Sequence, residues 1–317
     1  MAVDACATGG ALRARVACAA AVHASAERCP VADGGEGTME LLADALGGRL
    51  VAAVATDPLG RPIDCHVAIC GETAIVETAQ ASGLALVADD ERDPWAASTR
   101  GTGELILAAV GAGAREVLVA VGGSATSDGG RGAIDAIREG GGLGDARLAV
   151  LCDVELGFED AARVFGPQKG ADREMVARLE RRLAALASWL PRDPRGVPAT
   201  GAAGGLSGGL WAAFDAELRP GAAAVLDALR VDERLRASQL AVAGEGCIDE
   251  QSFGGKIVGE LVRRARVARV PIHAVVGTSR LSEHDRARAG LERVWTASTL
   301  EEIEEAGREL GAAAAGG

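Results

Sequence analysis

The sequence has no tyrosine, and aromatic residues of all kinds make up only 3% of it. Lysine is almost as rare, because only Lys169 and Lys256 occur beside 31 arginines. A GC-rich genome that replaces lysine by arginine accounts for the arginine excess. It does not account for the two lysines that remain, and these need a separate explanation.

Long apolar runs and an excess of positive charge are also missing. No run approaches the roughly 18 apolar residues that a membrane-spanning helix needs. The net charge is −12, whereas nucleic-acid binding depends on basic patches that neutralise phosphates. Residues 13–26 resemble a secretory signal weakly, but their alanine-rich composition favours a short helix. We therefore expect a cytoplasmic protein that acts on a small molecule and has no nucleic-acid or membrane partner. Whether it forms a homodimer stays open.

Closely spaced cysteine pairs are absent as well. The seven cysteines are scattered, and none forms a Cys-x-x-Cys motif. This pattern favours reduced, mostly buried thiols in a cytosolic protein. Cys65, His66 and Cys70 are close in sequence, but their spacing places them on alternating faces of a predicted strand, which argues against a metal site there.

Glycine, in contrast, is abundant, with 44 of 317 residues, about twice its usual share. The length predicts about two domains. Short β-branched runs alternate with helical patterns rich in alanine, leucine and arginine, as is typical of α/β proteins. We therefore predict two unlike α/β domains, with largely parallel sheets and glycine-rich loops at the C-terminal ends of the strands.

Five predicted strands end in glycine, hydroxyl or carboxylate residues, and ligands of open α/β sheets bind at such ends. They are a run ending at Val31, Glu116 to Val121, Leu148 to Cys152, Leu240 to Ala243 and Ile272 to Val276. Antiparallel hairpins are predicted where short turns join three further strands. These strands are Leu50 to Ala55, Ile63 to Ile69 and Thr73 to Glu77. Helices are predicted at Thr102 to Ala109, Ala133 to Arg138, Asp172 to Trp189 with Asp172 as N-cap, Lys256 to Arg266 and Leu300 to Leu310.

The segment Gly122 to Gly130 is a candidate phosphate-binding loop. Successive small residues free backbone N–H groups to surround phosphate oxygens, hydroxyl groups add to them, and a carboxylate can hold Mg²⁺. A tight turn between strand and helix is the plain alternative, but nine small or polar residues in a row exceed what a turn needs. The candidate cofactor-binding residues are Gly122, Gly123, Ser124, Thr126 and Asp128.

Familiar nucleotide motifs are absent. Gly255-Lys256 is followed by Ile257 and lacks the first glycine of a P-loop. No strand is followed by the dinucleotide fingerprint, which argues against an NAD-linked oxidoreductase. No Gly-x-Ser-x-Gly motif occurs, and the four histidines lie in unrelated contexts. Nucleophilic catalysis therefore has no support.

Carboxylates follow several strand ends, and Mg²⁺ takes one or two carboxylates together with substrate phosphates. Each carboxylate alone is better explained as a helix cap or a loop acceptor. Their shared placement is what favours a metal site. The residues are Asp33, Glu36, Asp128, Asp153, Glu245 and Asp249.

The two lysines both lie beside glycines in predicted loops at helix starts. At such a position the compact ammonium of Lys169 or Lys256 can reach a phosphate as a point charge. Chance placement is the alternative. Arg100 can pair with a substrate carboxylate through two hydrogen bonds, or it is a solvated arginine at a helix start.

Taken in order, these segments resemble the bacterial type-I glycerate kinase family. They span most of the chain and are Val31 to Gly37, Ser82 through Pro94, Ser98 to Leu105, Gly122 to Gly130, Cys152 to Val154, Phe165 to Ala171, Gly201 to Gly209 and Gly244 to Lys256. The resemblance implies ATP-dependent phosphorylation of D-glycerate, commonly at the 2-hydroxyl. It also implies that one domain is inserted in the other, which we place at residues 49–238 within residues 1–48 and 239–317.

The resemblance further implies roles for individual residues. The catalytic residues would be Asp33, Asp249 and Lys256, and ATP would bind the Gly122 to Gly130 loop. The glycerate or the transferred phosphate would face Arg100, Lys169 and Glu36. Mg²⁺ would be held by Asp128, Asp153 and Asp249. Asp33 would accept the hydroxyl proton or bind the metal, and the general base stays open among these carboxylates.

The chain also departs from the family pattern. Asp4-Ala5-Cys6-Ala7 lacks the usual serine and lysine, and the stretch between Ile137 and Leu148 is shortened. The usual Asn-Pro after Asp153-Val154 is missing, and Cys247 stands where an arginine is expected. These departures keep a second hypothesis open, a non-catalytic or altered-substrate paralogue that binds nucleotide or hydroxy acid.

Overall fold

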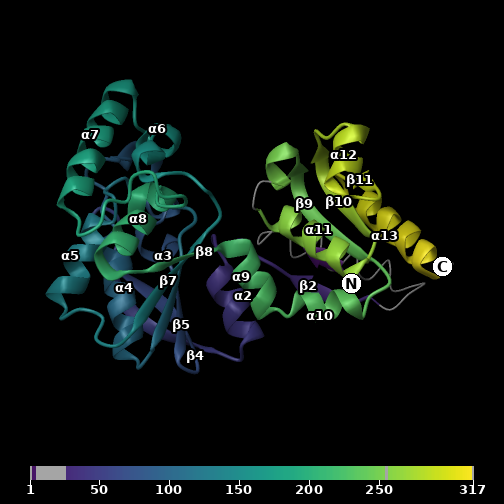
Figure 1. Cartoon of the computed structure of the whole chain (residues 1–317), viewed down its shortest axis with the longest axis horizontal. Helices are drawn as coiled ribbons and strands as arrows, with labels where there is room; N and C mark the ends of the chain where they lie inside the picture. The colour runs from purple at the N-terminus through teal and green to yellow at the C-terminus, as the bar shows by residue number, and fades with distance from the viewer. Residues whose placement is uncertain (1, 5–25, 254–255, 316–317) are drawn as a thin grey trace. The chain divides into compact units, whose positions relative to one another are not determined.

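The computed structural model describes residues 2–4, 26–253 and 256–315, and the chain divides into two compact units (Figure 1). Unit 1 combines residues 1–33 with residues 222–317, and unit 2 consists of residues 34–221. The domain limits near residues 48 and 239 stay a prediction about which parts fold independently. No helix among the described residues is long and apolar enough to cross a membrane.

Unit 1 is built on a five-stranded parallel sheet in the order β11-β10-β9-β1-β2. Val242 and Val275 on adjacent strands pack against Ile303 and Leu310 of the last helix, which therefore covers one face of this sheet. The strands are β1 (Ala2–Asp4), β2 (Arg28–Pro30), β9 (Ala241–Ile248), β10 (Ile272–Ser279) and β11 (Val294–Thr296), and the helices are α10 (Val231–Arg236), α11 (Ile257–Ala268), α12 (Glu283–Ala289) and α13 (Leu300–Ala315).

Two strands of unit 1 run further than the sequence predicts. β9 continues to Ile248 and β10 to Ser279, beyond the expected ends at Ala243 and Val276. The two extensions pair with each other, so Gly244-Glu245-Gly246 is strand and not loop. Glycine weakens the strand signal in a sequence, whereas a neighbouring strand that supplies hydrogen-bond partners holds it extended.

Unit 2 contains a six-stranded mixed sheet in the order β3-β4-β5-β6-β7-β8. The predicted hairpins are confirmed, since β3, β4 and β5 are antiparallel neighbours. They join the parallel strands β5 to β8 in one sheet instead of forming their own. The strands are β3 (Arg49–Thr56), β4 (Pro62–Cys70), β5 (Thr73–Glu77), β6 (Glu116–Ala120), β7 (Arg147–Cys152) and β8 (Glu217–Pro220).

Helices cover this sheet in layers (Figure 1). Leu105, Ile137 and Leu206, from α4, α5 and α8, share one buried cluster with Val119 of β6. α7 packs outside α8 through a second cluster around Phe158, while α2 contacts β4 and β5. A fully buried leucine or isoleucine contributes about 1.5–3 kcal/mol. The helices of unit 2 are α2 (Thr38–Ala45), α3 (Ala79–Ser82), α4 (Arg100–Gly111), α5 (Arg131–Glu139), α6 (Ala161–Phe165), α7 (Arg173–Trp189) and α8 (Ala202–Phe214). The next helix, α9 (Gly221–Ala228), belongs to unit 1 except for its first residue.

The predicted fold class and helices are confirmed. The five predicted helices lie within or overlap α4, α5, α7, α11 and α13, and the Asp172 carboxylate caps α7 by accepting the N–H of Met175 at 2.8 Å. Among the described residues no disulfide occurs, and Cys247 is the one exposed thiol. Cys6, Cys18 and nearly all of the stretch 13–26 lie outside the described residues.

Candidate active site

The parallel strands β5 to β8 end at one edge of the unit 2 sheet, and glycine loops meet there. A Cβ atom on Gly122 would lie 2.4 Å from the Cα of Gly35, and one on Gly34 would lie 3.1 Å from the carbonyl oxygen of Leu151. Side chains would therefore keep these backbones apart. The loop of residues 34–37 and the start of the Gly122 to Gly130 loop form one backbone surface at the ends of the strands.

Glu77 fixes the first of these loops. It ends β5 and is 4% exposed, and its carboxylate accepts the N–H of Gly37 at 3.1 Å and the N–H of Met39 at 3.2 Å. The carboxylate thus lies at the N-terminus of α2, where the helix dipole favours a negative charge. Burial raises the pKa of Glu77, and the two N–H groups oppose that rise. The sequence reasoning missed Glu77, although the predicted strand that ends in this acid was a signal.

Hydrogen bonds hold the first half of the Gly122 to Gly130 loop to the chain after β5. The N–H of Leu84 donates to the carbonyl oxygen of Gly123, and the N–H of Ala125 donates to that of Ser82, both at 2.8 Å. Gly122 is half-buried and Gly123 is exposed, whereas Ser124 and the rest of the loop are buried. Only the beginning of the loop is therefore accessible to a ligand.

The second half of the loop is enclosed by the other glycine-rich stretch. The N–H of Gly129 donates to the carbonyl oxygen of Gly204 at 3.1 Å. A Cβ atom on Gly204 would lie 2.0 Å from the carbonyl oxygen of Thr126, and Gly204 has a φ of +65°, which favours glycine. The glycines of residues 201–209 therefore serve close packing. Thr126, expected to bind the cofactor, is fully buried beneath them.

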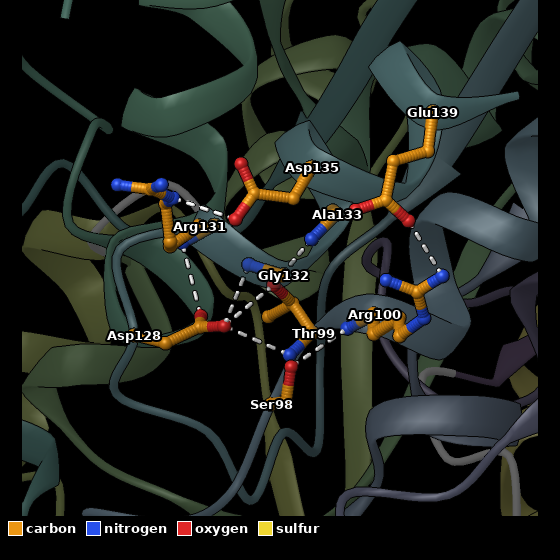
Figure 2. A network of polar contacts seen from close by, with 10 residues as sticks. Ser98, Thr99, Arg100, Asp128, Arg131, Gly132, Ala133, Asp135 and Glu139 are labelled. Carbon is orange, nitrogen blue, oxygen red and sulfur yellow. Dashed lines mark hydrogen bonds and ion pairs between the residues drawn. The ribbon is translucent and has the colours of Figure 1, made fainter. Parts of the chain in front are cut away.

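Asp128 links two helix N-termini, as Figure 2 shows. Its Oδ2 accepts the N–H and the hydroxyl of Thr99 at 2.9 Å and the N–H of Gly132 at 3.0 Å, and its Oδ1 accepts the N–H of Gly130 at 3.0 Å. The residue is 1% exposed. The expected role of Asp128 as a Mg²⁺ and cofactor ligand does not fit these contacts, because four protein donors already occupy its oxygens. These contacts favour the alternative named for each carboxylate alone, a helix cap.

Lys169 also lies inside unit 2. Its side chain is 2% exposed, and Nζ donates to Ser124 Oγ at 3.0 Å and to the carbonyl oxygen of Thr126 at 2.5 Å. Burial lowers the pKa of Lys169 to about 7, and the charge of Asp128 opposes this shift. The expected contact between Lys169 and a substrate does not fit this placement, because the ammonium points into the loop and away from solvent.

Arg100 lies at the start of α4 and is already paired. Its guanidinium contacts the carboxylate of Glu139 at 2.8 Å (Figure 2). It also contacts the carboxylate of Glu104 at 3.1 Å. Binding a substrate carboxylate would require these pairs to open, so the alternative of a surface arginine at a helix start fits better. Glu36 is exposed on the loop of residues 34–37, and half-buried Asp153 directly follows β7 at the same edge.

Unit 1 holds a second group of predicted site residues around the end of β9. Glu245 is half-buried, and its Oε2 is buried without a hydrogen bond. Burial raises the pKa of Glu245; Ser252 and Lys256 oppose the rise, whereas Asp249 and Asp33 add to it. Lys256 precedes α11 as its N-cap residue and is half-buried. The charges of Lys256, Asp249 and Asp33 therefore all act on the Glu245 carboxylate within this unit.

The carboxylates of unit 1 fit a Mg²⁺ ion that is also bound by phosphates. In the described part of the chain, no three His, Cys, Asp or Glu side chains are grouped so as to hold a metal by themselves. Mg²⁺ in nucleotide sites, however, takes only one or two carboxylates and fills its other positions with phosphate oxygens and water. The Oε2 atom of Glu245 has no hydrogen bond, and the charges of Asp249 and Asp33 act on this carboxylate. Such a group of carboxylates suits this kind of Mg²⁺ site.

Comparisons with known proteins point to one family. A sequence model described as the glycerate kinase family matches residues 2–140 and 139–315. Glycerate 2-kinase of Escherichia coli K12 is 37% identical over 78% of this chain and 75% of its own length, and glycerate kinase of Bacillus subtilis 168 is 38% identical over 79% and 75%. A crystal structure of a Salmonella typhimurium LT2 protein assigned as glycerate kinase 2 matches with a TM-score of 0.78 and 31% identity, over 99% of this chain and 96% of that one.

Proposed function

The chain belongs to the glycerate kinase family of phosphotransferases, and we propose that it transfers the γ-phosphoryl group of ATP to D-glycerate, with 2-phosphoglycerate as the favoured product. The observation that carries this proposal is the accessible Gly122-Gly123 backbone at the ends of parallel strands, braced by hydrogen bonds on both sides. Phosphoryl transfer needs mainly positioning and charge neutralisation. A rigid backbone surface provides the first of these.

The backbone that we propose to bind phosphate lies in unit 2. The N–H groups of Gly122 and Gly123 would donate to phosphate oxygens, and the Ser124 hydroxyl would lie just behind them. Glu36, exposed on the neighbouring loop, would accept a hydroxyl of glycerate. Asp128, Lys169 and Arg100 are not placed in contact with ligands, because their polar groups bond to other groups of the protein. Thr126 is not placed there because it is fully buried.

The charged residues that we propose to act in the reaction lie in unit 1. The ammonium of Lys256 would contact a phosphate oxygen, since its place before α11 adds the positive end of a helix dipole. Asp249 and Glu245 would hold Mg²⁺, which when bound neutralises phosphate charge. Asp33 would accept the proton of the reacting hydroxyl. Asp153, which follows β7 in unit 2, remains a proposed metal ligand only through its place at a strand end.

The test is D-glycerate-dependent ADP release by the full-length protein. We compare the parent with Lys256→Met and, as a matched control, with Arg308→Met, which removes an exposed cation from α13. Loss of a charge-assisted contact to a transferring phosphate costs about 2.7–4 kcal/mol, or about a hundredfold or more in rate. We expect Lys256→Met to lose that much of kcat and Arg308→Met to match the parent.

The product is identified in the same assay. 2-Phosphoglycerate is dehydrated directly by added enolase, whereas 3-phosphoglycerate also needs a mutase. Activity with enolase alone supports phosphorylation at the 2-hydroxyl. ADP release that does not depend on glycerate, or an undiminished Lys256→Met variant, would overturn the proposed mechanism.

A second candidate function rests on Cys247. This exposed thiol lies on the extended part of β9 where the family pattern has an arginine, and a lost cation weakens binding of an anion. A non-catalytic or altered-substrate paralogue would bind ATP–Mg²⁺ or glycerate in a calorimeter without turnover. Calorimetry on the parent protein therefore separates the two candidates.

A further inference from the structure

Within the described part of the chain, the side chain of Lys169 donates its hydrogen bonds to the middle of the Gly122 to Gly130 loop. It ends a short turn that begins at Pro167, and Gly170 directly after it has a φ of +95°, which turns the chain towards α7. From there Nζ donates to Ser124 Oγ and to the carbonyl oxygen of Thr126. Ser124 directly follows the accessible Gly122-Gly123 backbone, and Thr126 comes two residues later.

The rest of the loop is fixed by other groups. Ser82 and Leu84 hold its beginning through backbone hydrogen bonds, and Asp128 holds its end. Between these two ends of the loop, the Lys169 side chain donates hydrogen bonds to Ser124 and Thr126. Without this lysine, a buried carbonyl oxygen and a hydroxyl would lose their shared donor, which is costly inside a protein.

The two hydrogen-bond acceptors around Nζ suit a lysine that is readily deprotonated. An ammonium has three N–H donors, whereas a neutral amine has two, and Nζ has two acceptors here. The charged side chains on neighbouring elements are Asp128 and, beside Gly170, Arg92, which pairs with Asp89. A lysine buried in this way is a poor point charge for a phosphate, but it remains a good donor to the loop.

We propose that Lys169 is a positioning residue, which holds the Gly122-Gly123 backbone in its phosphate-binding conformation by bonding to Ser124 and Thr126 and does not itself touch the substrate. This inference rests on the proposed function, since it assigns the loop to ATP phosphates. It differs from a substrate contact because the lysine acts on the ATP side and through hydrogen bonds, not through its charge.

The kinetic test compares three full-length variants. Lys169→Met removes both hydrogen bonds while keeping the length and apolar stem of the side chain. Lys169→Gln keeps a neutral N–H donor, and Arg163→Met removes an exposed cation from nearby α6 as the control. Losing two buried hydrogen bonds corresponds to about a tenfold effect or more. We expect the KM for ATP of Lys169→Met to rise about tenfold and kcat to fall, with the KM for D-glycerate changed less than about twofold.

The Lys169→Gln variant shows whether Lys169 acts through its hydrogen bonds or through its positive charge. We expect Lys169→Gln to recover part of the affinity for ATP that Lys169→Met loses, because it can still donate to Thr126. A rise in the KM for D-glycerate alone would show that Lys169 contacts that substrate and would overturn the inference. Kinetics of Lys169→Met equal to those of Arg163→Met would overturn it as well.

A second measurement does not depend on activity. Hydrogen exchange of peptides that cover residues 122–130 should be faster in Lys169→Met than in the parent, while peptides from α4 and β6 keep their protection. If the parent protein shows no glycerate-dependent ADP release, the proposed function fails and this measurement still tests the positioning role. Unchanged exchange in residues 122–130 would remove the basis of the inference.

Discussion

Lys169 makes the stability of the protein depend on pH. The pKa of this lysine is about 7 in the folded chain, against 10.5 for an ordinary lysine. Between these two values the unfolded state binds a proton that the folded state does not, so stability rises as pH increases. The rise is at most about 1.4 kcal/mol per pH unit. Below pH 7 both states are protonated, and this group no longer contributes to the slope.

Urea unfolding of the parent and of Lys169→Met at pH 7, 8 and 9 measures this effect. We expect the parent to gain more stability than the variant over this range, because a methionine side chain at this position binds no proton in either state. Other titrating groups are common to both proteins and cancel in the difference. Parallel curves would mean that the Lys169 ammonium is not desolvated in the folded state.

The same residue shows how far sequence reasoning reaches. Two lysines among 31 arginines, both beside glycines, marked Lys169 as special. The direction of its side chain could not be predicted, because a lysine in a glycine loop can point to solvent or inward with the same local pattern. The inward direction depends on Ser124 and Thr126, which accept its hydrogen bonds and are more than 40 residues away in sequence. The sequence therefore singled out the position, whereas the burial of its side chain does not fit the contact assigned to it.

At the level of secondary-structure elements, Asp128 joins α4 to α5. It accepts N–H groups at the start of both helices, where the dipoles favour its charge. Asp128→Asn would turn one acceptor oxygen into an NH₂ group that faces these donors. Leaving buried donors unpaired costs about 1–3 kcal/mol each, so we expect the free energy of unfolding to fall by about 2–4 kcal/mol.

The matched control for this change is Asp135→Asn on the outer side of α5. Asp135 pairs with Arg131 at the surface, and such exposed pairs contribute about 0–1 kcal/mol. Urea unfolding followed by circular dichroism compares the two variants. If Asp128→Asn were as stable as Asp135→Asn, the carboxylate would be free enough to serve a metal, and its sequence-based assignment as a Mg²⁺ ligand would regain support.

Predictions of elements succeeded where one periodic pattern decides the structure. α7 has leucines at three- and four-residue steps and an aspartate cap, and it forms from Arg173 to Trp189 as expected. The extension of β9 through Gly244 and Gly246 was missed, because the partner strand β10 is needed to hold glycines extended. For the same reason, the sequence did not show whether glycines at 122–123 and at 201–209 bind ligands or pack together.

At the scale of the whole molecule, the scarcity of lysine becomes an experimental advantage. An acylating reagent for primary amines can reach at most the two lysines and the α-amino group. Lys256 is half-buried in unit 1, whereas Lys169 is enclosed in unit 2. We expect brief labelling of the native protein to acetylate Lys256 and to leave Lys169 unmodified, as read by mass spectrometry of peptides.

Labelling in urea supplies the reference, since both lysines should then react at similar rates. Native acylation should also remove the proposed kinase activity in step with modification of Lys256, and ATP with Mg²⁺ should slow both, because the phosphates would cover that ammonium. Reaction of native Lys169 as fast as in urea would show that unit 2 opens readily around the loop. A chain with ordinary lysine content could not separate these two sites in one experiment, whereas here each lysine reports on one unit.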